Sequence, residues 1–283
     1  SWFTDAFLGG GNDLFKLSAF HTAFNIINTL LLIGFVKQIE QFVCRVLPMK
    51  EQEEDYRLKF ISGGLLSTAE LSIMEAQKEI HNFAERCGKM FGFIGELLQL
   101  NDEVAFNKLF SRIEKYEQIT DNMEVEIASY LNMVSEGRLS LASKTEIQLM
   151  LRQITELESI GDSVYNLART INRYRMHCKE TFTEEQIQHM FVMLQLVHSS
   201  LDEMMKRIDM IVSNLPSSYR SDITKSINIE NELNNYRTQL KNQNLDDVNS
   251  GRYSYQLGVF YVDFISECEK LGDYVMNVVQ ATK

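Results

Sequence analysis

Two copies of one short motif hold the residues of this chain best suited to chemistry. Each reads Glu-x-x-Gly-Asp-x-x-x-Asn, first over residues 158–166 and again, about 111 residues later, over residues 269–277. Side chains four residues apart lie on one face of an α-helix, so the Glu, Asp and Asn of each copy form one oxygen-bearing stripe. Glycine inside a helix costs about 1 kcal/mol relative to alanine. Its repetition therefore predicts that a neighbouring backbone passes close by.

A second carboxylate pair precedes each copy of the motif. Glu117 and Asp121 precede the first copy, whereas Glu230 precedes the second and Asn234 stands where the aspartate would be. Carboxylates that converge in a groove between helices raise one another's pKa unless a cation is present. Oxygen ligands of this kind suit Mg, Ca, Mn, Fe or Zn. The predicted metal ligands are Glu117, Asp121, Glu158 and Asp162 in the first set, and Glu230, Glu269 and Asp273 in the second.

The alternative reading of these pairs is a solvated acidic face, and other chemistry is sparse. No histidine has Glu three residues before it, as di-iron oxidases require. The sequence also has no His-Glu-x-x-His, Gly-x-Ser-x-Gly or dinucleotide-binding motif. We expect His81 and His198 to be core or boundary residues, and His177 and His189 to lie on the surface. The protein is therefore not expected to be an enzyme.

Long helices must position these carboxylates, because the chain has only 2 prolines and no strand-like composition. Sequences that resemble capping boxes begin at Ser67, Ser143 and Thr183. The expected helices span residues 67–100, 103–136, 141–179, 184–214, 217–245 and 253–282. The formal net charge of -11 argues against a nucleic-acid partner, and 4 widely spaced cysteines favour a reducing compartment.

These six helices form two copies of a three-helix unit. Besides the central motif, residues 135–140 match residues 249–254, and residues 117–121 match residues 230–234. We therefore predict an all-α fold of two tandem three-helix bundles, with repeat one at 67–180 and repeat two at 181–283.

The N-terminal region has a different character. Residues 17–36 carry no formal charge and have about the length that spans a bilayer core. Lysines and arginines follow the run, which places its C-terminal side in the cytoplasm. We predict a transmembrane helix, with residues 1–48 as the end of a membrane domain and 49–66 as a linker to 67–283. A buried or interfacial amphipathic helix is the alternative. Since the sequence begins at Ser1 in mid-pattern, we expect a fragment of a longer protein.

The tandem bundles, and residues 157–166 in particular, resemble PhoU, the phosphate-uptake regulator. Residues 20–29 are similar to the last membrane helix of bacterial sodium/phosphate cotransporters with a PhoU-like tail. This resemblance implies that the protein lies in the bacterial inner membrane, with residues 49–283 in the cytoplasm. The partner of these residues would be the transporter's membrane domain in the same chain. We further expect a homo-oligomer. Some PhoU proteins bind multinuclear iron or zinc clusters through the paired motifs, which correspond here to the seven carboxylates named above. Asn234 departs from that pattern.

Three hypotheses follow. The first is a cytoplasmic regulatory module of a sodium-dependent phosphate transporter that binds metal through its Glu-x-x-x-Asp pairs. The second is a carboxylate-ligated metalloenzyme, and the third is a metal-free helical docking module.

Overall fold

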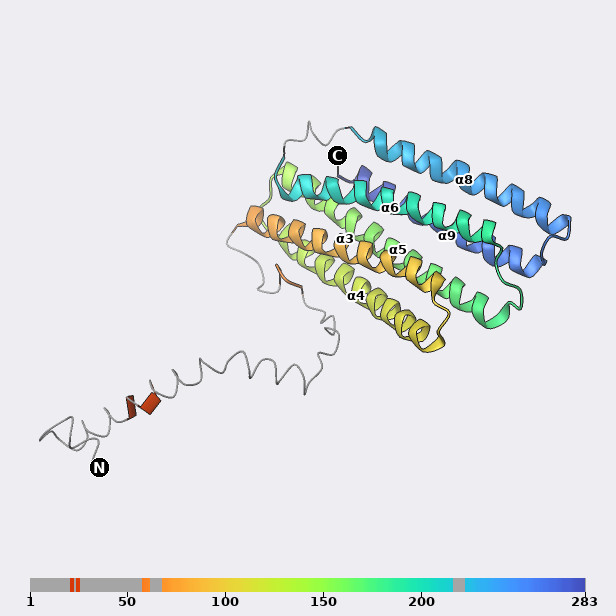
Figure 1. Cartoon of the computed structure of the whole chain (residues 1–283). Helices are drawn as coiled ribbons and strands as arrows, with labels where there is room; N and C mark the ends of the chain where they lie inside the picture. Colours follow the sequence, from red (N-terminus) through yellow and green to blue (C-terminus); the bar gives the residue numbers. More distant parts are fainter. Residues whose placement is uncertain (1–20, 23, 26–57, 62–67, 216–221, 283) are drawn as a thin grey trace, which may run out of the picture. The chain divides into compact units, whose positions relative to one another are not determined.

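Six long helices make up the part of the chain that carries the predicted carboxylates (Figure 1). The computed structural model describes residues 21–22, 24–25, 58–61, 68–215 and 222–282. The chain divides into two units, Ser1–Tyr56 and Arg57–Lys283, and all six helices belong to the second. They are α3 (Ala69–Gln99), α4 (Glu103–Ser135), α5 (Leu141–His177), α6 (Glu184–Val212), α8 (Thr224–Asn249) and α9 (Tyr255–Gln280). The described residues contain no strand, as predicted.

The predicted membrane helix falls almost entirely outside the described residues. Of residues 17–36, the structure describes only His21, Thr22, Phe24 and Asn25, which are helical and exposed. No helix in the described ranges is long and apolar enough to cross a membrane.

Five of the six helices begin after a side-chain cap, although two of the predicted capping residues are wrong. The Thr183 hydroxyl accepts from the Gln186 backbone N–H and the Gln186 side chain accepts from the Thr183 N–H, so this capping box is confirmed. Helix α5 is capped by Ser140, whose Oγ accepts from the Ser143 N–H at 3.0 Å, instead of by Ser143. Helix α3 is capped by Thr68 instead of Ser67.

Helix α8 departs most from its predicted range of 217–245. It begins at Thr224 without a side-chain cap and continues to Asn249. The chain then turns at Gly251, whose φ of +75° favours glycine. It is also the most exposed helix, and buries only Ser226, Leu233 and Leu240. Its polar sequence explains why its ends were hard to place.

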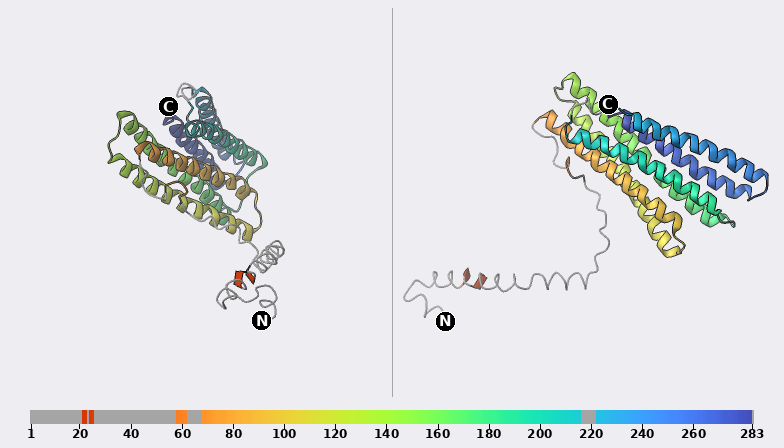
Figure 2. Two further views of the ribbon diagram at one scale, coloured as in Figure 1. Left: turned by 90° about the vertical axis from the view of Figure 1, so that its left-hand side faces the viewer. Right: turned by 45° about the horizontal axis from the view of Figure 1, so that its top comes forward.

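Two three-helix units pack side by side with their axes roughly aligned (Figure 2). In the first, α3, α4 and α5 all contact one another; in the second, α6, α8 and α9 do the same. The units meet where α5 packs on α9 and α3 packs on α6. One apolar stripe of α5 is buried, and it consists of Ile154, Leu157, Ile160, Val164, Leu167, Ala168 and Ile171. The apolar stripe thus fixes which face of α5 remains for polar groups.

Side chains, not a neighbouring backbone as predicted, lie closest to the two motif glycines. A Cβ added to Gly161 would lie 2.7 Å from Thr120 Oγ1 on α4. A Cβ added to Gly272 would lie 2.7 Å from Leu233 Cδ1 on α8. Thr120 and Leu233 correspond in the repeat alignment. Each glycine therefore lets the second helix of its unit pack tightly against the third.

The segment Leu58–Ile61 is attached to α3 through a buried carboxylate. Glu79 is 0 % exposed, and its Oε2 accepts hydrogen bonds from the backbone N–H groups of Lys59 (2.9 Å) and Phe60 (2.8 Å). Its Oε1 accepts from the Asn82 side chain at 2.8 Å. A buried carboxyl group is tolerated when its oxygens accept hydrogen bonds in this way.

Candidate functional site

The first acidic cluster consists of Glu117, Asp121, Glu158 and Asp162, from the adjacent helices α4 and α5. Glu117, Asp121 and Asp162 each offer an oxygen within 4.8 Å of the other two. Glu158 lies outside that trio, and its carboxylate accepts a hydrogen bond from Ser159 Oγ at 3.3 Å. The charges of Asp121 and Asp162 nevertheless both raise the pKa of Glu158. The structure therefore brings the two predicted pairs together and makes three of the four residues a possible ligand set.

The electrostatics of this cluster favour a cation. Burial is the largest cause of a raised pKa at Glu117, Asp121 and Glu158. The charge of Asp162 raises the pKa of all three further. Asp121 Oδ1 is in addition buried without a hydrogen-bond partner. An orphaned carboxylate oxygen among all-oxygen donors fits a hard cation such as Mg, Ca, Mn or Fe.

Glu124 lies beside the first acidic cluster and was not predicted from the sequence. Glu124, one helical turn after Asp121 on α4, raises the pKa of Asp121 and of Glu158 through its charge. Its carboxylate accepts from Thr155 Oγ1 at 3.4 Å. The signal in the sequence was its spacing of three residues from Asp121, which continues the same helix face.

The second acidic cluster consists of Glu230, Glu269 and Asp273, from α8 and α9. Burial raises the pKa of Asp273, the charges of Glu269 and Glu230 raise it further, and Arg237 lowers it. Arg237 Nη2 donates to Glu269 Oε1. A guanidinium already supplies positive charge here, and among the described residues this cluster does not form a ligand set like the first.

Arg237 is the second residue that sequence reasoning missed. In the alignment of residues 117–121 with 230–234, Arg237 corresponds to Glu124. The two clusters therefore differ at two aligned positions, where Asp121 and Glu124 become Asn234 and Arg237. The first cluster is strongly anionic, whereas Arg237 neutralises part of the charge of the second.

The asparagines of the repeated motif lie at the contact between repeats, not with the carboxylates as predicted. Asn166 Nδ2 on α5 donates to Glu267 Oε1 on α9 at 3.5 Å. Asn277 Nδ2 on α9 donates to Glu156 Oε2 on α5 at 2.9 Å. Glu156 and Glu267 are themselves aligned in the repeat. The two bonds thus form a reciprocal pair that links α5 to α9.

Among the described residues, no histidine belongs to the possible ligand set of the first acidic cluster. His81 is half-buried, as predicted, and its Nε2 lies 2.7 Å from Asp209 Oδ1. His198 is exposed, so its predicted core or boundary position is wrong, and its Nδ1 lies 3.2 Å from Asp202 Oδ2. His177 is exposed, as predicted. His189 was predicted to be a surface residue, but it is half-buried and its Nδ1 lies 3.0 Å from the hydroxyl of buried Tyr261.

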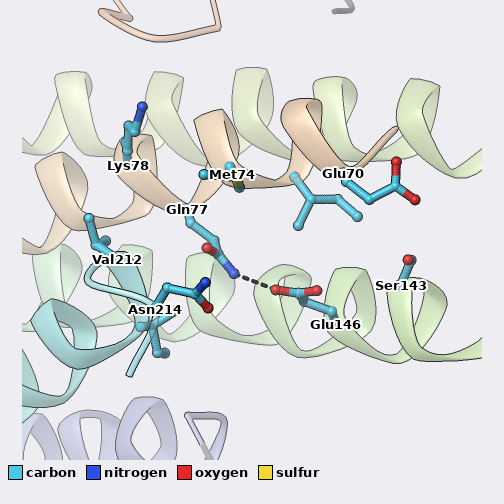
Figure 3. Close-up of a pocket in the computed structure, with 10 residues that line it drawn as sticks. Glu70, Met74, Gln77, Lys78, Ser143, Glu146, Val212 and Asn214 are labelled. Atoms are coloured by element: carbon cyan, nitrogen blue, oxygen red, sulfur yellow. Dashed lines mark hydrogen bonds between the residues drawn. The ribbon is translucent and has the colours of Figure 1, made fainter. Parts of the chain in front are cut away.

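The described helices enclose cavities, among them the following two. The first, of about 230 Å³, is formed by α3, α5 and the C-terminal end of α6 (Figure 3). Gln77 and Glu146 are hydrogen-bonded across it, as the dashed line shows. The second, of about 320 Å³, lies between α5 and α9 and is lined by Asn166, Arg169, Thr170, Arg173, Asp263, Ser266 and Glu267. We refer to this second cavity as the seam pocket.

Comparison with known proteins identifies the fold. No model of a known protein family matches the chain, and no curated protein sequence matches it. Among solved structures, the chain is similar to the phosphate transport system regulatory protein PhoU from Streptococcus pneumoniae. The TM-score is 0.53 at 14% sequence identity, and the match covers 76% of this chain and 91% of that one. The described helices therefore have a PhoU-like fold.

Proposed function

We propose that this chain is the regulatory module of a sodium-dependent phosphate transporter, with residues 49–283 in the cytoplasm of a bacterium. Residues 17–36 would be the last membrane helix of the transporter, whose membrane domain is then the module's partner. The observation that carries the proposal is the PhoU-like fold of the helices, found in one chain with the charge-free run of residues 17–36. The module acts by binding, without catalysis of its own.

The first acidic cluster is the proposed metal site. Glu117, Asp121 and Asp162 would supply ligands, and Glu158 a further oxygen. Iron, zinc, manganese, magnesium and calcium are the candidates. Glu230, Glu269 and Asp273 would bind more weakly, because Arg237 already balances part of their charge.

A metal at the first cluster would link α4 to α5 and so favour one arrangement of the first repeat. A ligand shifts a conformational equilibrium only through its different affinity for the two states. Since α5 also contacts α9, a change in α5 reaches the second repeat directly. This gives the module a route by which a bound cation biases the transporter.

Sodium-driven uptake of radiolabelled phosphate tests the proposal in cells that express the protein containing this chain. Asp121→Asn with Asp162→Asn should change the uptake rate, because it removes two of the three ligands. Glu126→Gln is the control, since Glu126 is exposed on α4 outside the cluster. If uptake does not depend on sodium, or if the double variant behaves like the control, the proposal fails.

Membrane association and oligomeric state test the proposed membrane helix at residues 17–36. The whole chain should fractionate with membranes, or self-associate without detergent through residues 17–36, because an exposed apolar helix must be covered. A chain shortened to begin at Thr68 should stay in the soluble fraction. A whole chain that is soluble and monomeric without detergent would contradict the membrane assignment.

A further inference from the structure

The seam pocket is lined by the two helices that join the repeats. Asn166, Arg169, Thr170 and Arg173 come from α5, and Asp263, Ser266 and Glu267 come from α9. Its volume of about 320 Å³ exceeds the roughly 30 Å³ that one water occupies in the liquid. It therefore has room for a small polyatomic ligand that contacts both repeats.

Unused hydrogen-bond donors face this pocket. Arg169 makes no hydrogen bond or ion pair with any described residue; its guanidinium lies 5.8 Å from the centre of the Tyr165 ring. Arg173, one turn later, donates from Nη2 to the hydroxyl of buried Thr170 at 3.2 Å. That hydroxyl keeps its own proton to donate. The half-buried Ser266 hydroxyl has no hydrogen-bond partner in the described ranges.

The two carboxylates of the pocket already face cations or donors. Asp263 Oδ2 lies 3.8 Å from Arg173 Nη2. Glu267 Oε1 lies 3.7 Å from Lys270 Nζ and accepts from Asn166. Arg169 thus has no ion-pair partner among the residues that line the pocket, and its charge also lowers the pKa of Glu117 in the first acidic cluster. On a chain of net charge -11, this is a local site for an anion.

We propose that the seam pocket binds a single tetrahedral oxyanion, and phosphate in particular. The guanidinium groups of Arg169 and Arg173 offer paired N–H donors that match two oxygens of such an anion. Thr170 and Ser266 add hydroxyl donors from the two helices. The choice of phosphate over other oxyanions rests on the proposed function, whereas the existence of an anion site rests on the pocket itself.

The repeat symmetry explains why one site is expected per chain. In the alignment of the two motifs, Gln280 corresponds to Arg169 and Arg152 corresponds to Asp263. The opposite end of the α5–α9 contact therefore lacks the arginine pair on one helix. A ligand in the seam pocket would contact α5 and α9 together and stabilise the arrangement of the repeats that holds the pocket open.

Isothermal titration calorimetry of the whole chain with sodium phosphate tests the site, at constant ionic strength. Arg169→Gln should weaken phosphate binding at least about tenfold, because a hydrogen bond to a charged group is lost. Arg152→Gln removes the same charge from α5 outside the pocket and should leave affinity unchanged. Asp263→Asn should strengthen binding, since it removes a carboxylate that competes for Arg173. Circular dichroism confirms that each variant is folded.

One phosphate per chain with this order of affinities supports the proposal. No binding by the folded wild-type chain up to tens of millimolar phosphate, or equal losses in Arg169→Gln and Arg152→Gln, overturns it. A second titration uses sulfate in place of phosphate. Equal binding of sulfate supports an oxyanion site and overturns the preference for phosphate, and neither result bears on the uptake assay that tests the proposed function.

Discussion

Within the first acidic cluster, Asp121 is the residue whose ionised form is least favourable when no cation is bound. Its Oδ1 is buried without a hydrogen bond, and burial together with the charges of Asp162 and Glu124 raises its pKa. A carboxyl group whose pKa is higher in the folded than in the unfolded state stabilises the fold less as pH rises. The metal-free protein should therefore lose stability as pH increases from about 4 through the raised pKa values.

Asp121→Asn should stabilise the metal-free protein at pH 7, because it removes a like charge at little cost in volume. We expect an increase in melting temperature of about 1–3 °C, since exposed charge interactions contribute up to about 1 kcal/mol. The increase should vanish below about pH 3, where the carboxyl groups are protonated in both the folded and the unfolded state. Thermal unfolding in chelator at several pH values measures this, with Glu126→Gln as control. A lower melting temperature at pH 7 would show that repulsion is not the dominant effect.

The motif glycines provide a matched pair of substitutions. Gly161→Ala places a Cβ against Thr120, a stiff β-branched residue that is fully buried, and should destabilise the protein by about 1–3 kcal/mol. Gly272→Ala meets only the end of the flexible Leu233 side chain. Better helix propensity, worth about 1 kcal/mol, should offset most of that contact. Urea unfolding compares the two; equal costs would contradict this account, and Thr120→Ala should partly rescue Gly161→Ala.

The candidate ligands were predictable at the residue scale because their spacing is local. Glu117 with Asp121, and Glu158 with Asp162, share a helix face in any helix. The roles of Glu124, Arg237 and the two asparagines depend on what the next helix places opposite them. Asn166 meets Glu267 across a gap of about a hundred residues in sequence, and no local pattern specifies that contact.

At the scale of elements, the pair α5 and α9 organises the molecule, since each is the third helix of its unit and they pack on each other (Figure 1). Five of the six helix ranges were predicted from the sequence to within a few residues. Helix α8 was harder, because a helix that buries three residues has almost no apolar stripe to read. Its position depends on contacts with α6 and α9.

Comparison of the two units predicts that Arg237 takes the place of a cation in the second. Asn234→Asp with Arg237→Glu recreates the acidic arrangement of the first cluster. This double variant should be less stable than wild type in chelator, and added Mn²⁺ or Mg²⁺ should restore stability by about 1–3 kcal/mol. Melting curves with and without metal measure the gain. If metal leaves the double variant unchanged, Arg237 is not what distinguishes the two clusters.

At the scale of the whole molecule, Glu79 ties the chain before α3 to the bundle. Glu79→Ala should leave the Lys59 and Phe60 amides without their acceptor, and the Asn82 side chain without one partner. The expected cost is about 1–3 kcal/mol, because two part-buried backbone donors and the buried Asn82 side chain lose their acceptor. Hydrogen exchange should show selective loss of protection at the Lys59 and Phe60 amides. Unchanged protection there would mean that other contacts hold the segment.

The PhoU-like fold gives this molecule two similar units, and their difference in charge makes one of them the stronger candidate for metal. If the first acidic cluster binds a divalent cation, binding stabilises the fold by about 2.7 kcal/mol at a hundredfold excess over the dissociation constant. For a protein of this size that corresponds to about 5–10 °C in melting temperature.

The most direct measurement is therefore the melting temperature of the whole chain with chelator and with added Mn, Fe, Zn, Mg or Ca, for wild type, Asp162→Asn and Asp273→Asn. We expect chelation to lower the melting temperature of wild type, Asp162→Asn to abolish most of that sensitivity, and Asp273→Asn to abolish much less. A wild-type melting curve that neither chelator nor any of these metals moves would contradict the metal site and leave an acidic helix face.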